Sequence, residues 1–583
     1  MSKAYASLKR AYGNGFISDI AWHFANYAQR LDSQGPESVI VAAALVSESA
    51  VSGEIRLELA HWGGGCVFEE HHSTAYLLPE MEAWCQELKT SPLVSDGEFP
   101  APLVLTEDRC LYLYRYYELE RRLAALITLR SGPIMIEIGS DEIERTLDVL
   151  FGDDPLAGDQ RDAARNALDH RFTVISGGPG TGKTSTVMRT LRMLWRLTNV
   201  SPARTLVCAP TGKAAARLRE VMGLELKAGD DATGFLGDAV TIHRLLGWQP
   251  GGKFKYGLNR PLNCDLLILD EASMVDIALM VSLLEALPEK ARLILLGDRD
   301  QLSSVEAGAV LGDLCRAADE GHPIGSVTSL RHNWRFGGHS EIANLAAAVR
   351  EGQTQAAVEF LNESHSDAVV FVDPGGEKTL EHLVRDHIVP IYKELSQSVI
   401  SGASCSDIFS MLDQVMVICA RRNGVGGVID VNRQVRAQLR TLSLASDLEF
   451  YLGLPLMVTK NEPTLGLFNG DVGVVIGGAN VTDLKVVFQR ANQEHVSVSI
   501  NRLPECHPAY ALTVHKAQGS QAKRVILVLP ETDSKVLSRE LVYTGLTRAR
   551  ESVEIWSSLN VFSAAVSRTA ARPTGLMERF RCH

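Results

Sequence analysis

The sequence predicts an α/β fold with two doubly wound parallel sheets, accompanied by a helical N-terminal domain and a small β-rich insert. From Gln160 onward, short apolar runs rich in β-branched residues alternate with helical patterns. The first block contains four strand-like runs: Phe172–Ser176, Arg204–Ala209, Asp265–Asp270 and Arg292–Gly297. Strands separated by helices pair in parallel, and their ligands bind beyond the carboxyl ends of the strands. A second block of this kind runs from about Val415 to the end of the chain.

The length of the chain requires several domains, because 583 residues exceed what one hydrophobic core can organise. Residues 1–128 are expected to form a helical domain, since Ser18–Leu31 and Leu111–Ile127 are amphipathic at helical spacing. The first α/β domain is expected over residues 129–345 and the second over residues 346–583. Within the second, residues 448–504 carry short strand-like runs and turn signals, which indicate the β-rich insert.

Composition and charge narrow the class of protein. The hydrophobic content of 45% fits a folded soluble chain. No apolar run is long enough to cross a bilayer and the N-terminus lacks the apolar core of a secretion signal, so we expect a cytoplasmic protein. The ten cysteines form no C-x-x-C pair, which argues against structural zinc or a disulfide framework. Because the formal charge is −12, the surface as a whole does not attract nucleic acid, and we expect any contact with it to be limited to a local basic groove.

A glycine-rich loop marks the candidate nucleotide site. The sequence fits the pattern G-x-x-x-x-G-K-[ST] at Gly177-Gly178-Pro179-Gly180-Thr181-Gly182-Lys183-Thr184. The loop lies between an apolar run and a helical run, as a phosphate loop requires; a chance glycine-rich turn is the alternative. Its backbone N–H groups close around phosphates at the start of the helix. We expect Lys183 to pair with the β- and γ-phosphates of ATP, and the hydroxyl of Thr184 to bind Mg²⁺.

Two acids at the end of another buried strand complete the expected hydrolytic site. Asp270 and Glu271 directly follow the run Leu266–Leu269. We expect Asp270 to hold Mg²⁺ and Glu271 to polarise the attacking water. Acids also stabilise the start of a helix, so a capping role is the alternative. These motifs indicate a nucleotide-hydrolysing protein, a property that kinases, transporters and GTPases share.

A third strand end carries Gln301, within the turn Gly297–Leu302. Its position one strand after the acidic pair favours a sensor of the γ-phosphate that reports hydrolysis to a second site. Taken alone, such a turn is as often an ordinary surface loop.

In this order the motifs resemble those of superfamily 1 helicases. Other segments are similar to further motifs of that family: Ala209–Ala215 to motif Ia, Thr241–Gly247 to motif Ib, Leu330–Phe336 to motif IV, Ala511–Ser520 to motif V and Leu541–Arg550 to motif VI. The resemblance implies that Gln160 recognises the adenine of ATP. It also implies that Arg335 and Arg548 are arginine fingers, which contact the phosphates of ATP. It also implies a set of residues that bind single-stranded DNA: Pro210, Thr211, His243, Thr513 and His515. Any one of the polar members could instead cap a helix or be a satisfied core group.

Among these helicases the chain resembles the RecD family over nearly its whole length. The resemblance is most specific in four segments: Ser176–Lys183, Asp298–Leu314, Leu465–Gly473 and Glu540–Arg550. It implies two RecA-like P-loop ATPase domains, an insert of SH3-like β-barrel type, and ATP and Mg²⁺ as cofactors. It further implies 5′→3′ translocation on single-stranded DNA.

The same resemblance implies partners and a cellular role. The chain would join RecB-like and RecC-like subunits in a heterotrimer, with residues 1–128 docking on the RecC-like subunit. That complex would repair double-strand breaks and degrade linear duplex DNA. We find no cluster of acids with lysine that would make a nuclease, so that site is expected on the RecB-like partner. A stand-alone RecD-like helicase is the main alternative; an inactive scaffold and a P-loop enzyme acting on small molecules are the others.

Overall fold

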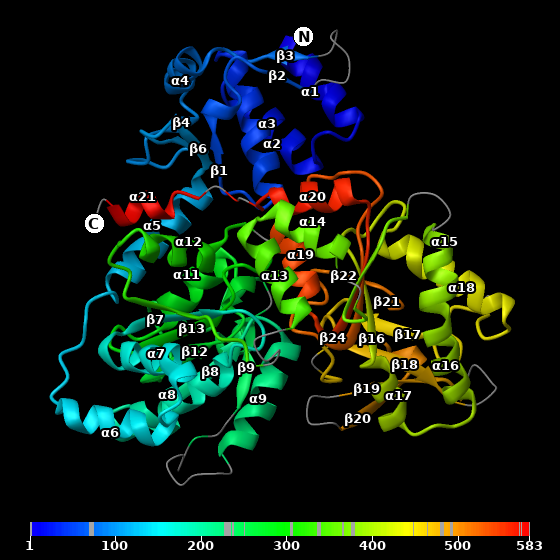
Figure 1. Ribbon diagram of the computed structural model, residues 1–583. Coiled ribbons are helices and arrows are strands. Elements are labelled where there is room, and N and C mark those ends of the chain that lie inside the picture. The colour runs from blue at the N-terminus through cyan, green and yellow to red at the C-terminus, as the bar shows by residue number, and fades with distance from the viewer. Residues whose placement is uncertain are drawn as a thin grey trace.

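The computed structural model describes residues 3–68, 75–226, 235, 238–249, 251–303, 307–334, 340–363, 366–374, 379–446, 448–462, 464–477, 483–489, 494–570, 572 and 574–581. Figure 1 shows an N-terminal region above two lobes that stand side by side, each built around a sheet. Within the described residues, no helix has the length and apolar character needed to span a membrane.

The first lobe contains a six-stranded parallel sheet with the strand order β14-β7-β13-β12-β8-β9. Its strands are β7 (Phe172–Gly177), β8 (Thr205–Ala209), β9 (Ala239–Thr241), β12 (Leu266–Leu269), β13 (Arg292–Gly297) and β14 (Ser326–Leu330). The helices around it are α6 (Ser140–Phe151), α7 (Gly158–Asp169), α8 (Lys183–Leu197), α9 (Gly212–Leu226), α10 (Ile242–Leu245), α11 (Ile277–Ala286) and α12 (Val310–Asp319). Leu266 and Ile268 pack into one apolar layer, whereas Leu267 and Leu269 pack into the layer on the opposite face. Burial on both faces explains why these strands are continuous apolar runs in the sequence.

Parallel pairing brings the functional loops of this lobe to one edge of the sheet. Leu269 at the end of β12 lies opposite both Leu295 and Cys208, and Gly297 lies opposite Ser176. The segments that follow β7, β8, β12 and β13 therefore leave the sheet at the same edge, where α/β proteins bind ligands.

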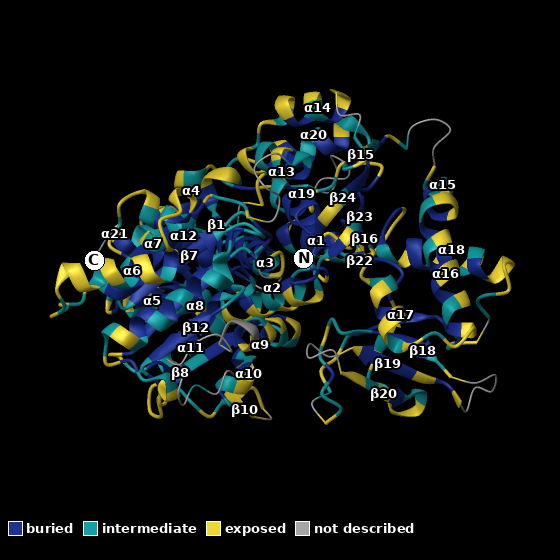
Figure 2. Ribbon diagram, turned by 60° about the horizontal axis from the view of Figure 1, so that its bottom comes forward, coloured by how far each residue is buried: buried dark blue, intermediate teal, exposed yellow. Residues whose placement is uncertain are grey.

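The second lobe contains a five-stranded parallel sheet with the order β15-β24-β23-β16-β22. Its strands are β15 (Val369–Val372), β16 (Val415–Cys419), β22 (Leu512–Thr513), β23 (Ala522–Val528) and β24 (Ala549–Trp556). The helices of this lobe are α13 (Glu341–Glu351), α14 (Thr354–Glu363), α15 (Leu380–His382), α16 (Val389–Ile400), α17 (Cys405–Leu412), α18 (Val428–Thr441), α19 (Arg539–Leu546) and α20 (Leu559–Ser567). Figure 2 shows that the strands of both parallel sheets are largely buried. The expectation of a mixed α/β fold with two parallel sheets is confirmed.

The β-rich insert of the second lobe is a five-stranded antiparallel sheet in the order β20-β19-β18-β17-β21. Its strands are β17 (Pro455–Val458), β18 (Val472–Ile476), β19 (Lys485–Gln489), β20 (His495–Ser499) and β21 (Cys506–Pro508). Its apolar face shares one core with α16 and α18 of the lobe. The strands extend a few residues beyond the expected limit at residue 504.

The N-terminal region contains the expected helices and, in addition, short strands that the expectation of a helical domain did not include. It contains α1 (Lys3–Gly13), α2 (Asp19–Leu31), α3 (Glu37–Val51), α4 (Met81–Thr90) and α5 (Tyr114–Thr128), and a sheet of β1 (Arg56–Glu58), β6 (Cys110–Leu113), β5 (Leu103–Leu105) and β4 (Val94–Ser95). Leu103–Leu105 and Cys110–Leu113 pair as a buried antiparallel hairpin. The predicted helix Leu111–Ile127 includes Leu111–Leu113 because these apolar residues continue the helical pattern of α5.

The C-terminal segment leaves the second lobe and returns to the other two parts of the molecule. After α20 the chain reaches α21 (Leu576–Arg581), which lies against α5 and α12. Glu120 of α5 is fully buried there, and accepts hydrogen bonds from Gly575 N at 2.6 Å and Arg579 Nε at 3.1 Å. This segment therefore connects both lobes and the N-terminal region.

Candidate nucleotide site and nucleic-acid interface

The phosphate loop joins β7 to α8 in the conformation that its glycines permit. Gly180 and Gly182 have φ angles of +89° and +82°, in the left-handed region that favours glycine. The Thr181 hydroxyl donates to Gly178 O at 2.8 Å, which closes the turn. Lys183 begins α8, and its Nζ donates to Gly178 O at 3.1 Å and also contacts Gly177 O. The lysine is thus folded over the loop at the start of the helix.

The loop is also contacted by residues far away in the sequence. Gln160 Nε2 donates to Thr181 O at 3.4 Å, and a Cβ atom at Gly182 would lie 2.6 Å from the same amide nitrogen. From the segment after β14, Asn333 Nδ2 donates to Pro179 O at 3.0 Å and Trp334 N donates to Gly180 O at 2.9 Å.

The chain thus passes the phosphate loop immediately before Arg335. Arg335 itself lies outside the described residues.

The acidic pair stands at the carboxyl end of β12. Burial, followed by the charge of Glu271, raises the pKa of Asp270 to about 6, and Lys183 acts in the opposite direction. Glu271 has a φ of +51°, which is unusual for a residue with a side chain and typical of functional sites. Its side chain makes no capping hydrogen bond to the short helix that follows, and α11 is capped by Asp276. The capping alternative therefore receives no support from these contacts.

The turn after β13 connects the two lobes. Gln301 is buried, and its Nε2 donates to Asp298 Oδ2 at 2.9 Å. Tyr543 of α19 donates to the same carboxylate oxygen at 3.2 Å. Burial raises the pKa of Asp298 above its usual value, and the nearby Lys183 lowers it. The predicted sensor thus shares one buried carboxylate with a side chain of the second lobe.

The backbone of Leu302 strengthens this connection. Its N–H donates to the Thr544 hydroxyl at 3.0 Å, and its carbonyl accepts from Gln518 Nε2 at 2.8 Å. Sequence reasoning missed Asp298, Tyr543, Thr544 and Gln518 as interlobe contacts. They lie within the motif segments, but nothing in a linear sequence pairs residues that are more than 200 positions apart.

Arg548 follows α19 and is only 2% exposed. Its Nε donates to Thr544 O at 3.0 Å and its Nη1 donates to Ser520 O at 3.4 Å. Burial lowers the pKa of this guanidinium, while the charges of Glu271 and Asp298 raise it. A cation of the second lobe therefore lies within electrostatic range of Glu271 and Asp298, at the carboxyl-end edge of the first sheet.

The five candidate DNA residues lie at or just after the carboxyl ends of strands of the two sheets. Pro210 and Thr211 follow β8, and His243 is an exposed residue of α10 after the neighbouring β9. Thr513 ends β22, and His515 lies in the turn after it. Two hydroxyls have local partners, since Thr211 Oγ1 accepts from Ala214 N at 3.2 Å and Thr513 Oγ1 accepts from Lys516 N at 3.2 Å.

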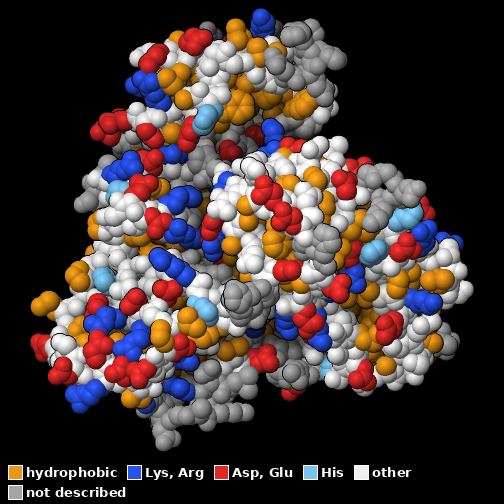
Figure 3. Space-filling view, viewed as in Figure 1, with side chains coloured by type: hydrophobic (Ala, Val, Ile, Leu, Met, Phe, Trp, Pro, Cys, Tyr) orange, Lys and Arg blue, Asp and Glu red, His pale blue; other side chains and the backbone are white. Residues whose placement is uncertain are grey.

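The loops of the two lobes meet near these residues. Lys213 Nζ donates to Ser520 Oγ at 2.7 Å, which links the segment after β8 to the segment after β22. The insert joins them, because Lys516 Nζ donates to Asn469 Oδ1 at 2.6 Å. Burial and the charge of Arg572 lower the pKa of His515, so its imidazole is neutral at neutral pH. Figure 3 shows acidic and basic side chains interspersed on the face in view.

Three protein-family models match separate parts of the chain. The model described as "RecBCD enzyme subunit RecD, N-terminal domain" matches residues 13–112. A model described as an AAA domain matches residues 160–307, which contain the phosphate loop, the acidic pair and Gln301. A UvrD-like helicase C-terminal domain model matches residues 508–555, which contain Thr513, His515 and Arg548.

Curated relatives match almost the whole chain. The protein "RecBCD enzyme subunit RecD" of Mycobacterium tuberculosis (strain CDC 1551 / Oshkosh) is 36% identical over 596 residues, which span 99% of this chain and 97% of that protein. Its namesake in Haemophilus influenzae is 33% identical, over 80% of this chain and 79% of that protein. The "ATP-dependent RecD2 DNA helicase" of Deinococcus radiodurans is 33% identical, over 83% of this chain and 60% of that protein.

Proposed function

The chain belongs to the RecD family and is an ATP-dependent DNA helicase, and from this premise we propose that it is the 5′→3′ motor subunit of a RecBCD-type complex. In that complex it pulls single-stranded DNA through a groove across both lobes, while RecB-like and RecC-like subunits supply the nuclease and the scaffold. The complex processes double-strand breaks for recombinational repair and degrades linear duplex DNA. This role implies a cytoplasmic location.

The share of each relative that the chain covers favours a RecD of the type that assembles into a RecBCD complex. The Mycobacterium tuberculosis relative bears the name of a RecBCD subunit and is covered over 97% of its length. The chain spans only 60% of the Deinococcus radiodurans RecD2 helicase. The match of residues 13–112 to the RecD N-terminal domain supports residues 1–128 as the docking domain, followed by RecA-like domains over residues 129–345 and 346–583. The antiparallel sheet would be the SH3-type barrel.

In the proposed mechanism, ATP lies over residues 177–184, with Lys183 on its β- and γ-phosphates and Gln160 on its adenine. Glu271 orients and polarises the attacking water. Arg335 and Arg548, from the second half of the chain, stabilise the charge that develops in the transition state. The contacts of Gln160, Asn333 and Trp334 with the phosphate loop support this arrangement.

Mg²⁺ would be held by the hydroxyl of Thr184 and the carboxylate of Asp270. When bound, this ion neutralises charge on the β- and γ-phosphate oxygens. The residues fit a hard cation, because both offer oxygen ligands. Burial and the neighbouring charge of Glu271 raise the pKa of Asp270, and a bound cation would favour the ionised form of its carboxylate. Thr184 lies in the first turn of α8, after β7, and Asp270 directly follows β12, so both stand at the carboxyl-end edge of the same parallel sheet.

The observation that carries the motor proposal is the interlobe contact around Asp298. Gln301 and Tyr543 share its Oδ2 atom, so a change at the γ-phosphate sensor reaches α19 of the second lobe directly. Closure of the lobes around ATP and reopening after hydrolysis would then shift the loops that carry Pro210, Thr211 and His243 relative to those that carry Thr513 and His515. These five residues grip single-stranded DNA in the proposal.

The decisive experiment is strand displacement on duplexes with a single-stranded tail at either the 5′ or the 3′ end. The full chain should displace strands only from 5′ tails, and its ATPase activity should rise when single-stranded DNA is added. Lys183→Gln should abolish both activities, with Lys89→Gln on the N-terminal surface as the matched control. Displacement only from 3′ tails would refute the proposed polarity.

Stand-alone action is the second candidate, and the similarity to the RecD2 helicase favours it. Co-purification of the tagged full chain from its own cells discriminates between the two. Recovery of stoichiometric RecB-like and RecC-like subunits supports the complex. Recovery of an active, monomeric helicase without them supports stand-alone action.

A further inference from the structure

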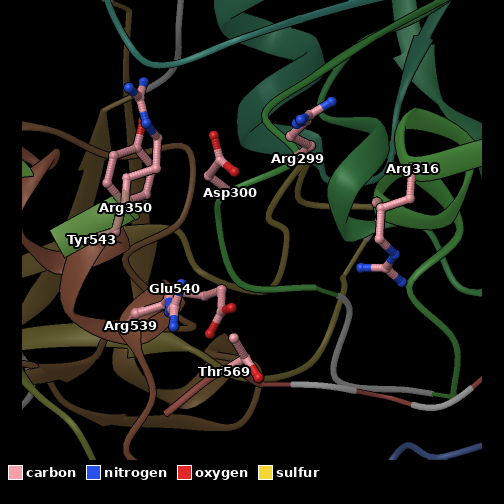
Figure 4. A pocket seen from close by; sticks show the side chains of 9 residues that line it. Arg299, Asp300, Arg316, Arg350, Arg539, Glu540, Tyr543 and Thr569 are labelled. Atoms are coloured by element: carbon pink, nitrogen blue, oxygen red, sulfur yellow. The ribbon is translucent and has the colours of Figure 1, made fainter. Parts of the chain in front are cut away.

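A cationic cavity of about 210 Å³ lies between the lobes, beside the turn that carries the predicted sensor. Its walls include Arg299 and Asp300 of the first lobe, and Arg350, Arg539, Glu540 and Tyr543 of the second. Figure 4 shows Asp300 facing Arg350 and Tyr543 across the open space, with Arg539 and Glu540 together on another side. Because both lobes contribute, the cavity changes shape whenever the lobes move.

The cavity is built for an anion. Four arginines and two carboxylates line it, in a protein whose overall formal charge is −12. Three of the arginines also pair with acids outside the lining, as Arg299 Nη1 does with Asp319 Oδ2 at 2.8 Å. Arg539 differs, because its Nη2 donates a 3.4 Å hydrogen bond to a backbone oxygen, Ser567 O. Among the described residues it has no ion pair with a carboxylate, and its Nε is buried without a hydrogen-bond partner.

The two carboxylates select among anions. A carboxylate repels a fully ionised oxyanion, but accepts a hydrogen bond from one that retains a proton. Inorganic phosphate retains a proton at neutral pH, whereas sulfate and the phosphodiester of DNA do not. Guanidinium groups beside Asp300 and Glu540 therefore match a protonated phosphate best. The cavity, at about 210 Å³, has room for one tetrahedral ion with some hydration.

The cavity adjoins the phosphate loop through a single side chain. Tyr543 lines the cavity, and its hydroxyl would lie 2.7 Å from a Cβ atom placed at Gly178 of the loop. The same hydroxyl donates to Asp298, whose Oδ1 accepts from Asp300 N at 3.1 Å. A ligand in the cavity would therefore contact Asp300 and Tyr543, both of which are hydrogen-bonded to the carboxylate that also holds Gln301.

We propose that this interlobe cavity, lined by Arg299, Asp300, Arg350, Arg539, Glu540 and Tyr543, binds inorganic phosphate, and that it receives the phosphate released by ATP hydrolysis. This inference rests on the proposed ATPase function. Phosphate in the cavity bridges arginines of the two lobes and keeps them together until it departs. Release of phosphate then permits the lobes to separate, because the guanidinium groups on either side lose their shared counter-ion.

The test measures the binding of inorganic phosphate to the full chain by calorimetry, with Mg²⁺ and a saturating non-hydrolysable ATP analogue present. The analogue occupies the phosphate loop, so any phosphate that binds reports a second site. We expect saturable binding, at least tenfold weaker binding of sulfate, and no displacement of phosphate by a single-stranded oligonucleotide. Arg539→Gln should weaken phosphate binding at least tenfold. Arg433→Gln, an arginine with a 77% exposed side chain on α18, is the matched control and should leave it unchanged.

A second variant tests the selectivity and guards against misfolding. Glu540→Gln removes the negative charge that repels a fully ionised oxyanion, and should reduce the preference for phosphate over sulfate without a loss of thermal stability. Absence of saturable phosphate binding to the unmodified chain, equal binding of sulfate, or displacement by DNA would each overturn the inference. DNA-stimulated ATPase activity measured in parallel separates the phosphate-binding inference from the proposed function. Retained activity without phosphate binding refutes phosphate binding in the cavity and leaves the proposed function intact. Absent activity refutes the proposed function.

Discussion

The hydroxyl of Tyr543 donates a 3.2 Å hydrogen bond to Oδ2 of Asp298, across the boundary between the two lobes. Both residues are buried, at 5% and 2% exposure, so the bond is shielded from competing water. Asp298 directly follows β13 of the first sheet, beside the phosphate loop, and Tyr543 lies in the helix that precedes Arg548. Their contact gives the nucleotide site a short mechanical connection to the second lobe.

Tyr543→Phe should uncouple ATP hydrolysis from strand displacement. The change removes the hydroxyl and one hydrogen bond worth about 1 kcal/mol, but keeps the ring in its buried position. We expect more ATP to be consumed for each base pair that is opened, with the ATPase rate reduced less than the displacement rate. Measurement of both rates on one tailed duplex gives the ratio. Tyr27→Phe, at a side chain exposed on α2, is the control; a ratio that Tyr543→Phe leaves unchanged would contradict the coupling role.

Arg548→Gln should reduce kcat of the DNA-stimulated ATPase by roughly 10³-fold or more, because an arginine finger stabilises charge that develops only in the transition state. The KM for ATP should change far less. Arg550→Gln is the matched control, since Arg550 is exposed two residues away on β24 and should be dispensable. Steady-state kinetics at saturating DNA checks both variants. A raised KM with normal kcat would instead assign Arg548 to ground-state binding.

Asp313 of α12 should make stability depend on pH. Burial raises its pKa from 3.8 to about 7, although Arg316 and the Thr574 hydroxyl act in the opposite direction. The folded chain therefore binds more protons than the unfolded chain between about pH 4 and 7, so the contribution of this group to stability rises as pH falls through 7 and levels off below 4. The slope is at most about 1.4 kcal/mol for each pH unit.

Urea denaturation of the unmodified chain and of Asp313→Asn, at pH 5 and pH 8, tests this dependence. The unmodified chain should gain stability relative to the variant at the lower pH. Glu359→Gln, at an exposed acid of α14, should show no such difference. If the gap between the unmodified chain and Asp313→Asn is the same at both pH values, the carboxyl does not titrate in this range.

Arg579→Met should destabilise the junction of the C-terminal segment with α5. The substitution leaves Glu120 fully buried without its guanidinium partner, and loss of one member of a buried ion pair costs about 3 kcal/mol. The thermal transition should shift to lower temperature by several degrees. Arg581→Met, whose arginine is 58% exposed and pairs with Glu320, should shift it by far less. Equal shifts of the thermal transition in the two variants would show that the buried ion pair contributes no more to stability than the exposed one.

Local patterns in the sequence identified much of the candidate site. The phosphate loop, the Asp270–Glu271 pair and the turn of Gln301 each follow a strand directly, so strand periodicity and a few loop residues suffice to recognise them. Parallel pairing then brings their loops to one edge, as expected. The N-terminal region was less predictable, because the apolar residues of β6 merge with the helical pattern of α5 and hide a four-residue strand.

The sequence alone determined the chemical groups that each segment offers: side-chain oxygens at Thr184 and Asp270, an amine at Lys183, and guanidinium groups at Arg335 and Arg548. The tertiary structure decided which groups meet. It joined Tyr543 to Asp298, Lys213 to Ser520, and Glu120 to Arg579 at the far end of the chain. Hydrophobic burial brings such partners together from hundreds of residues apart, because it depends on area removed from water and not on position along the chain. No local pattern encodes those pairings.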